Sequence, residues 1–253
     1  CQSSSASGVL TVNALPTVTV NSDTICAGDS AVTFTATSST ATSWLWSGQG
    51  TGTNATTSGT TAGNYTVVVT DANSCQSSSA SAVLTVNALP TPPTISASGA
   101  TIFCDGGSVD LTSSETTGNV WSTSATSQAI TVTTSGNYSA IYTDGNGCSA
   151  TSAATAVTIT ALPTVTVNDA TLCVGDSPAT FTATSATATS WLWSGQGTGT
   201  NQTTSGTTAG DYTVVVTDAN SCQSSSASGV LTVNALPTVT VNSESICAGD
   251  SAA

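Results

Sequence analysis

The sequence predicts an all-β chain of tandem immunoglobulin-like β-sandwich repeats, stacked end to end in an elongated rod. Short runs of Val, Thr and Ala alternate between turns rich in Gly and Asn, which is typical of half-buried strands. One segment, at 64–90, returns almost unchanged at 211–237 and in a diverged form at 137–163. A Trp upstream of the segment and a Tyr near its start also recur with each copy, as a small sandwich core requires.

The self-similarity predicts three complete repeats, at 14–87, 88–160 and 161–234. Residues 1–13 match the last strand of a preceding repeat, and residues 235–253 match the start of a following one. The linkers read Asn-Ala-Leu-Pro or Thr-Ala-Leu-Pro. Because Pro fixes its own φ and restricts the residue before it, such linkers predict a semi-rigid stack.

The first repeat illustrates the expected strands. Alternation predicts them at 17–21, 31–37, 43–47, 66–70 and 82–86, with one or two short edge strands in the Gly- and Thr-rich stretch 48–63. Six or seven short strands in about 74 residues fit an immunoglobulin-like sandwich.

Six aromatic residues are the expected core, two from each repeat: Trp46, Tyr65, Trp121, Tyr138, Trp193 and Tyr212. Trp46 aligns with a Trp in every repeat, whereas Trp44 aligns with Asn119. We therefore expect Trp44 and its counterpart Trp191 at the rim, exposed enough to stack on a glycan.

The composition excludes several functions. The chain has no Lys, Arg or His and has 13 acidic residues. Nucleic-acid binding needs cations that neutralise phosphates, and a Ser or Cys nucleophile needs a base such as His. A glycosidase needs two carboxylates in a cleft, whereas these carboxylates fall in predicted turns. We expect no enzyme, no cofactor, no nucleic-acid partner and no membrane span.

Eight cysteines occupy two positions per repeat. Four precede the second strand (Cys26, Cys104, Cys173 and Cys247), and four lie in the last hairpin turn (Cys1, Cys75, Cys148 and Cys222). Such regular pairs predict disulfides formed in an extracellular, oxidising setting.

Two connectivities remain open, beside free thiols. Bonds within repeats would join Cys26–Cys75, Cys104–Cys148 and Cys173–Cys222. In an immunoglobulin-like sandwich, however, the first turn and the last hairpin turn lie at opposite ends, about 20 Å apart, and a disulfide needs Cα atoms within about 7 Å. Bonds between successive repeats, Cys26–Cys148 and Cys104–Cys222, are therefore favoured. Cys1, Cys75, Cys173 and Cys247 would then pair outside the sequence given.

The turn carboxylates Asp71, Asp144 and Asp218 are weak Ca²⁺ candidates, since Ca²⁺ takes oxygen ligands. Ordinary turn chemistry explains them more simply, because Asp bonds to its own backbone in turns.

Several landmark strings resemble a known class of repeats. ICAGDS at 25–30, Trp46 and GNYTVVVTDANSC at 63–75 are similar to the immunoglobulin- and PKD-like repeats of very large Bacteroidota surface proteins, among them gliding-motility adhesins. The resemblance covers all three repeats and both partial ones. It implies export by the type 9 secretion system, attachment at the outer membrane and an adhesive stalk or filament. It also makes Thr24, Ser30 and Ser251 candidate O-glycosylation sites.

The sequence thus predicts the structural repeat region of a secreted cell-surface adhesin or filament. Its expected partners are neighbouring repeats, other copies in a filament, and a surface or glycan target. Two alternatives remain: the repeats are themselves multivalent glycan-binding modules, or they are spacers of a secreted hydrolase.

Overall fold

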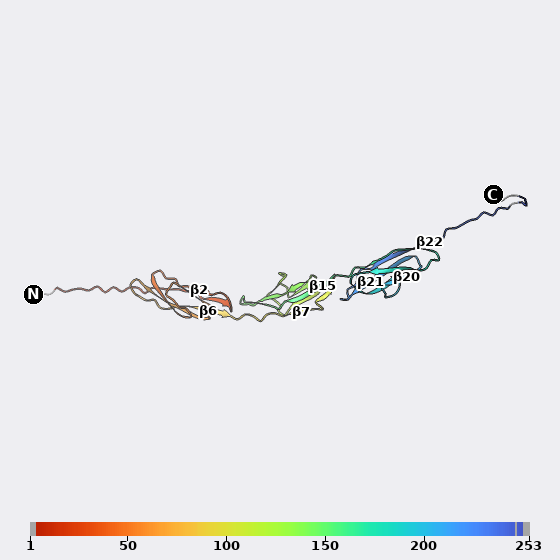
Figure 1. Ribbon diagram of the computed structural model, residues 1–253. Coiled ribbons are helices and arrows are strands. Elements are labelled where there is room, and N and C mark those ends of the chain that lie inside the picture. The colour runs from red at the N-terminus through yellow and green to blue at the C-terminus, as the bar shows by residue number, and fades with distance from the viewer. Residues whose placement is uncertain (1–3, 246, 250–253) are drawn as a thin grey trace. The chain divides into compact units, whose positions relative to one another are not determined.

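A computed structural model of the chain describes residues 4–245 and 247–249 (Figure 1). These residues form strands, turns and irregular segments and contain no helix, so no helix in the described part could cross a membrane. The chain divides into two compact units, Cys1–Ser96 with Leu111–Ile130 and Tyr138–Thr155, and Ala97–Asp110 with Thr131–Asn137 and Ala156–Ala253. The division passes through the predicted second repeat.

The first predicted repeat contains two sheets. Its strands are β1 (Asp23–Cys26), β2 (Val32–Thr35), β3 (Ala41–Gly48), β4 (Thr56–Gly59), β5 (Gly63–Asp71) and β6 (Ala80–Asn87). One sheet has the order β1-β6-β5-β3, with β1 parallel to β6, and the other pairs β2 with β4. The prediction of a strand at 17–21 is wrong, because this segment forms only an isolated β-bridge, between Thr19 and Thr37.

The second predicted repeat has shorter strands in three small sheets. They are β7 (Ile95–Ala97), β8 (Ile102–Cys104), β9 (Val109–Ser113), β10 (Asn119–Trp121), β11 (Ala129–Val132), β12 (Gly136–Tyr138), β13 (Ala140–Thr143), β14 (Ser149–Thr151) and β15 (Thr155–Thr160). The sheet orders are β10-β13-β14, β11-β9-β7 and β12-β15-β8, and β15 runs parallel to β8.

The third predicted repeat has the same arrangement as the first, with one added short strand, β16 (Thr166–Val167). Its other strands are β17 (Ala170–Cys173), β18 (Ala179–Thr184), β19 (Ala188–Gly195), β20 (Thr203–Gly206), β21 (Gly210–Asp218) and β22 (Ala227–Asn234). The sheets have the orders β17-β22-β21-β19 and β16-β18-β20, with β17 parallel to β22. These are all-β immunoglobulin-like sandwiches.

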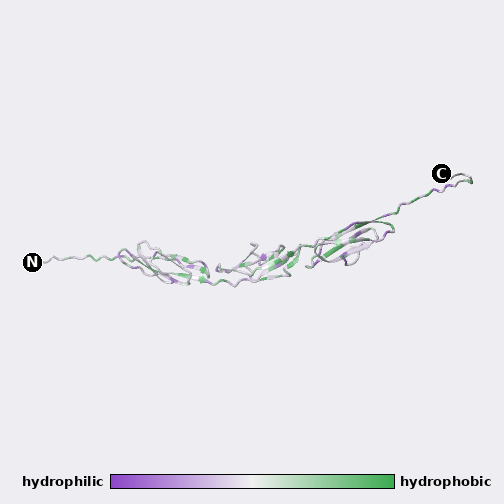
Figure 2. Cartoon of the chain, in the orientation of Figure 1, coloured by the Kyte–Doolittle hydropathy of each residue, from purple (hydrophilic) through white to green (hydrophobic). Residues whose placement is uncertain are grey.

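Alternating strand residues form the cores. Tyr65, Val67 and Val69 on β5 are buried, whereas the residues between them are only half-buried, as a strand with one face on a core requires. Phe34 of the other sheet stacks on Tyr65, with ring centroids 4.4 Å apart. Hydrophobic residues accordingly lie along the strands in Figure 2.

All six expected core aromatics are buried, none more than 7% exposed. The polar ends of the tryptophans are also satisfied. The indole Nε1–H of Trp46 donates to the Asn54 carbonyl at 2.9 Å, and those of Trp121 and Trp193 donate to equivalent loop carbonyls. Each Trp therefore fixes the loop beside it as well as filling the core.

Trp44 and Trp191 are not exposed, so that expectation is wrong. Both are half-buried and pack against their cores, and each buries an indole Nε1–H that has no hydrogen-bond partner. The reason is the strand period: Trp44 lies two residues before Trp46 on β3 and therefore points to the same inner face.

A close contact between Gly206 and Tyr212 tests this packing. A Cβ at Gly206 would collide with the phenol oxygen of Tyr212 and lie 2.8 Å from its Cε1, so the ring would have to move off Phe181. We expect Gly206→Ala to lower the free energy of unfolding by about 1–3 kcal/mol in denaturant titrations. Gly99→Ala is the control, because its Cβ would meet no atom within 4 Å. Equal losses in both variants would contradict this packing.

Candidate functional site: the cysteine junctions

Three of the first-turn cysteines end strands that run parallel to the last strands of their own repeats. Cys26 pairs with Asn87, Cys104 with Thr160 and Cys173 with Asn234. The next residue then hydrogen-bonds to the same partner, as Ala27 N–H does to the Asn87 carbonyl at 2.8 Å. The cysteine therefore lies beside the point where the chain leaves the repeat for the linker.

A tight turn holds Cys26 and Cys173 in place. Gly28 and Gly175 have φ of 94° and 96°, values that suit glycine, and the following Asp returns a carboxylate to the cysteine. Asp29 Oδ2 accepts from Cys26 N–H at 2.8 Å, and Asp176 Oδ2 accepts from Cys173 N–H at 2.7 Å. Asp29 and Asp176 are therefore turn residues.

The hairpin cysteines lie in turns closed by an aspartate. Asp144 Oδ1 accepts from the N–H groups of Asn146 and Cys148, both at 2.9 Å. Asp71 and Asp218 make the same pair of bonds in their own turns. The turn has this form at Cys75 too, which is unbonded, so the disulfide does not create the turn.

One turn position requires a left-handed backbone, and the sequence did not reveal it. The residue before the hairpin cysteine has φ of 63° at Ser74, 82° at Gly147 and 65° at Ser221. Gly adopts this conformation freely, whereas Ser does so at a cost. The sequence did hold one sign of this left-handed position: the second repeat has Gly where the other two have Ser.

Two disulfides join these cysteines. Cys26 is bonded to Cys148 and Cys104 to Cys222, each with Cα atoms 5.6 Å apart. They are the two pairs that the sequence favoured, and the bonds within repeats expected as the alternative do not form. Each bond lies inside one compact unit, the first in the unit that contains Cys1–Ser96 and the second in the other.

The remaining described cysteines, Cys75, Cys173 and Cys247, are free. Cys1 and Ser251 lie outside the described residues. Burial separates bonded from unbonded hairpin cysteines, because Cys148 and Cys222 are at most 1% exposed whereas Cys75 is half-buried. The bonded turns are therefore covered by their junctions.

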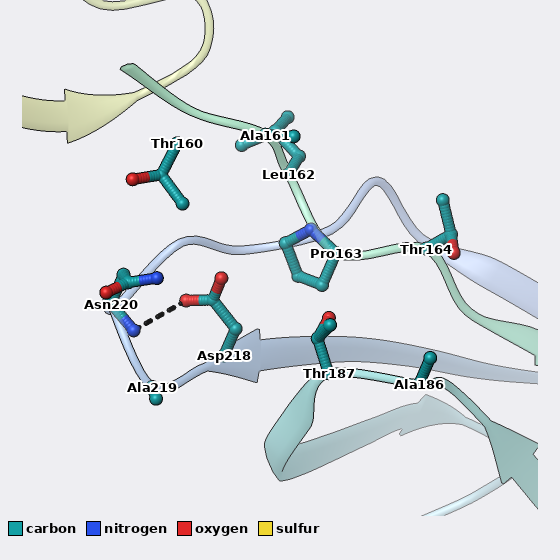
Figure 3. Close-up of a pocket in the computed structure, with 10 residues that line it drawn as sticks. All are labelled: Thr160, Ala161, Leu162, Pro163, Thr164, Ala186, Thr187, Asp218, Ala219 and Asn220. Atoms are coloured by element: carbon teal, nitrogen blue, oxygen red, sulfur yellow. Dashed lines mark hydrogen bonds between the residues drawn. The ribbon is translucent and has the colours of Figure 1, made fainter. Parts of the chain in front are cut away.

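A shallow cavity of about 510 Å³ lies where the linker 161–163 passes the Cys222 turn (Figure 3). Leu162 and Pro163 line one side, and Asp218 and Asn220 line another. Asp218 is only 8% exposed here, and its Oδ1 is already engaged by the turn N–H of Asn220 at 2.9 Å. The cavity is thus the space between linker and turn, and its carboxylate is committed to the turn.

The Ca²⁺ candidates lie in three different turns. Asp71, Asp144 and Asp218 each serve a separate turn, and the residues that the structure describes contain no group of three Cys, Asp or Glu suited to a metal. The candidate glycosylation residues Thr24 and Ser30 are exposed on either side of Cys26.

No protein-family model and no curated protein matches the chain. Among solved structures, a three-immunoglobulin-domain fragment of titin is 18% identical, with 87% of this chain and 98% of that one covered and a TM-score of 0.39. The Sidekick-1 immunoglobulin domains 1–5 are 16% identical over 87% of this chain and 59% of that one, at 0.31. The fibronectin(III)-like modules of Clostridium thermocellum CbhA are 14% identical over 59% and 100%, at 0.30.

The strands and sheets described above define a tandem immunoglobulin-like repeat protein. Its disulfides indicate an oxidising, extracellular or secreted location.

Peptide mapping without reductant tests the connectivity. The chain has no Lys or Arg, so Asp-directed and chymotryptic cleavage replace trypsin. We expect linked peptides that contain Cys26 with Cys148 and Cys104 with Cys222. A Cys26–Cys75 peptide would contradict the assignment.

Substitution of Asp218 tests the turn. Asp218→Ala leaves the N–H groups of Asn220 and Cys222 without their acceptor, and we expect it to lower the free energy of unfolding by about 1–3 kcal/mol. Asp218→Asn keeps an oxygen at this place and serves as the matched control. Denaturant unfolding under non-reducing conditions measures both, and equal stability of the two variants would argue against this role.

Proposed function

We propose that this chain is the structural repeat region of a large secreted cell-surface adhesin or filament, where it forms a stalk. The observation that carries the proposal is the repeated junction, in which a first-turn cysteine is bonded to a hairpin cysteine 122 or 118 residues further on. Such bonds join one repeat to the next. A stalk of many repeats needs this connection, whereas a single binding domain does not.

The repeats in this proposal are 14–87, 88–160 and 161–234, stacked as an elongated rod. Cys75, Cys173 and Cys247, together with Cys1, would continue the same bonding pattern with repeats outside the sequence given. The net charge of −13, with no cation, keeps neighbouring copies soluble and mutually repelling.

The finer assignment rests on the resemblance of the landmark strings. It proposes a Bacteroidota surface protein similar to the gliding-motility adhesin SprB, exported by type 9 secretion and attached at the outer membrane, with Thr24 and Ser30 as glycosylation sites. Under this proposal the chain is not an enzyme.

The glycan-binding alternative loses its main support. It relied on Trp44 and Trp191 as exposed stacking platforms, and both are half-buried against their cores. Nothing in the described residues favours a second function over the stalk.

Deletion of one repeat from the native protein tests the stalk. Removing residues 88–160 should shorten the filament by about 35–40 Å in electron micrographs, from strands of about 3.3 Å per residue plus end loops. Attachment of the cells should persist, because the stalk only spaces the adhesive part.

Loss of attachment in that variant, with filaments still displayed, would instead favour repeats that bind the target themselves. The Trp44→Phe and Trp191→Phe pair is the control for aromatic contact, since Phe keeps the core filled while removing the indole.

A further inference from the structure

The two disulfides give the chain a covalent connectivity that differs from its sequence order. Starting at Ser4 and moving to Cys26, a covalent path crosses to Cys148 and continues to Cys173 without entering residues 27–147. A second path runs from Cys75 to Cys104, crosses to Cys222 and continues to residue 245. We call these the first and second covalent lines.

The lines consist of the strands on either side of each linker. Residues 75–104 include β6, the linker, β7 and β8, and residues 148–173 include β14, β15, the linker, β16 and β17. Each continuous stretch is short, 30 and 26 residues respectively. Fully stretched, 26 residues span only about 90 Å.

The two lines are paired with each other in every repeat. β1 of the first line runs parallel to β6 of the second, β8 of the second to β15 of the first, and β17 of the first to β22 of the second. The other strands lie in three connecting segments, 27–74, 105–147 and 174–221, which start on one line and end on the other. These segments carry most of the buried core.

We infer that the repeats form a double covalent line of limited extensibility, in which axial tension follows the two lines and bypasses the connecting segments. Unfolding a sandwich releases chain from its connecting segment, but that segment is not on the shortest covalent path. Tension therefore cannot lengthen the path by unfolding the cores. The inference goes beyond the proposed stalk, because it depends on connectivity and not on what the stalk displays.

A single-molecule pulling experiment measures this directly on the whole chain. Azide-bearing residues at Ser4 and Ser177, both exposed, attach the handles, and free thiols are alkylated first. With Cys26–Cys148 intact, the path has 22 residues from Ser4 to Cys26 and 29 from Cys148 to Ser177, a limit of about 180 Å. Without either disulfide it has 173 residues, about 600 Å, and without Cys26–Cys148 alone it crosses Cys104–Cys222 and has 145 residues, about 510 Å.

The oxidised protein should therefore stop extending near the shorter limit even after the sandwiches unfold. Added reductant should raise the limit by about 430 Å, from the 122-residue loop, whereas Cys148→Ser, which keeps Cys104–Cys222, should raise it by about 330 Å. Cys26→Ser removes the same bond and guards against a folding defect specific to one variant. Cys104→Ser is the matched control, because it removes the other disulfide, which is not on this path, and should leave the limit unchanged.

A nick gives an independent readout. The chain has no Lys or Arg, so trypsin would cut Thr126→Arg once, in the exposed loop of the connecting segment 105–147. The oxidised tether should hold load after cleavage, and the reduced tether should part. Three results would overturn the inference: a long extension of the oxidised chain, a longer limit in Cys104→Ser, or rupture of the nicked oxidised tether.

Discussion

The parallel pairing of the first-turn strand with the last strand of each repeat is the constraint on which the rest depends. Because β1 and β6 run in the same direction and end in register, Cys26 and Asn87 reach the same edge of the sheet together. One continues as the peptide linker and the other as a disulfide. An antiparallel partner would have put the cysteine at the other end of the strand, where it could bond only elsewhere.

The cores and the disulfides both stabilise the folded chain, in different ways. Each core is small, built around one Trp, one Tyr and a few Val or Leu residues, and the sequence has no basic side chain to form a salt bridge. A bond that closes a loop of 122 residues restricts the unfolded chain, worth about 4–5 kcal/mol in the chain-entropy model. The cores in turn hold the Asp-closed hairpin turns that present Cys148 and Cys222 in position for bonding.

Sequence reasoning predicted the features that periodicity and polymer geometry determine. The six buried aromatics and the two favoured cysteine pairs follow from self-similarity and from the length of a strand. The sequence analysis misplaced Trp44, because its alignment with Asn119 suggested a polar position at the rim. Asn119 is in fact buried, and its amide donates to the Glu115 carbonyl at 2.7 Å. The left-handed backbone at Ser74 had one signal in residue type, the Gly at the equivalent position 147, whereas the missing strand at 17–21 had none.

Diffraction from crystals of the oxidised chain, with the anomalous signal of sulfur, tests the central claim most directly. The Sγ atoms of Cys26 and Cys148 should appear as one joined peak, with a second joined peak for Cys104 and Cys222, and with Cys75 and Cys173 standing alone. Joined peaks for Cys26 with Cys75, or for Cys173 with Cys222, would contradict the account, because the covalent lines would then close within single repeats.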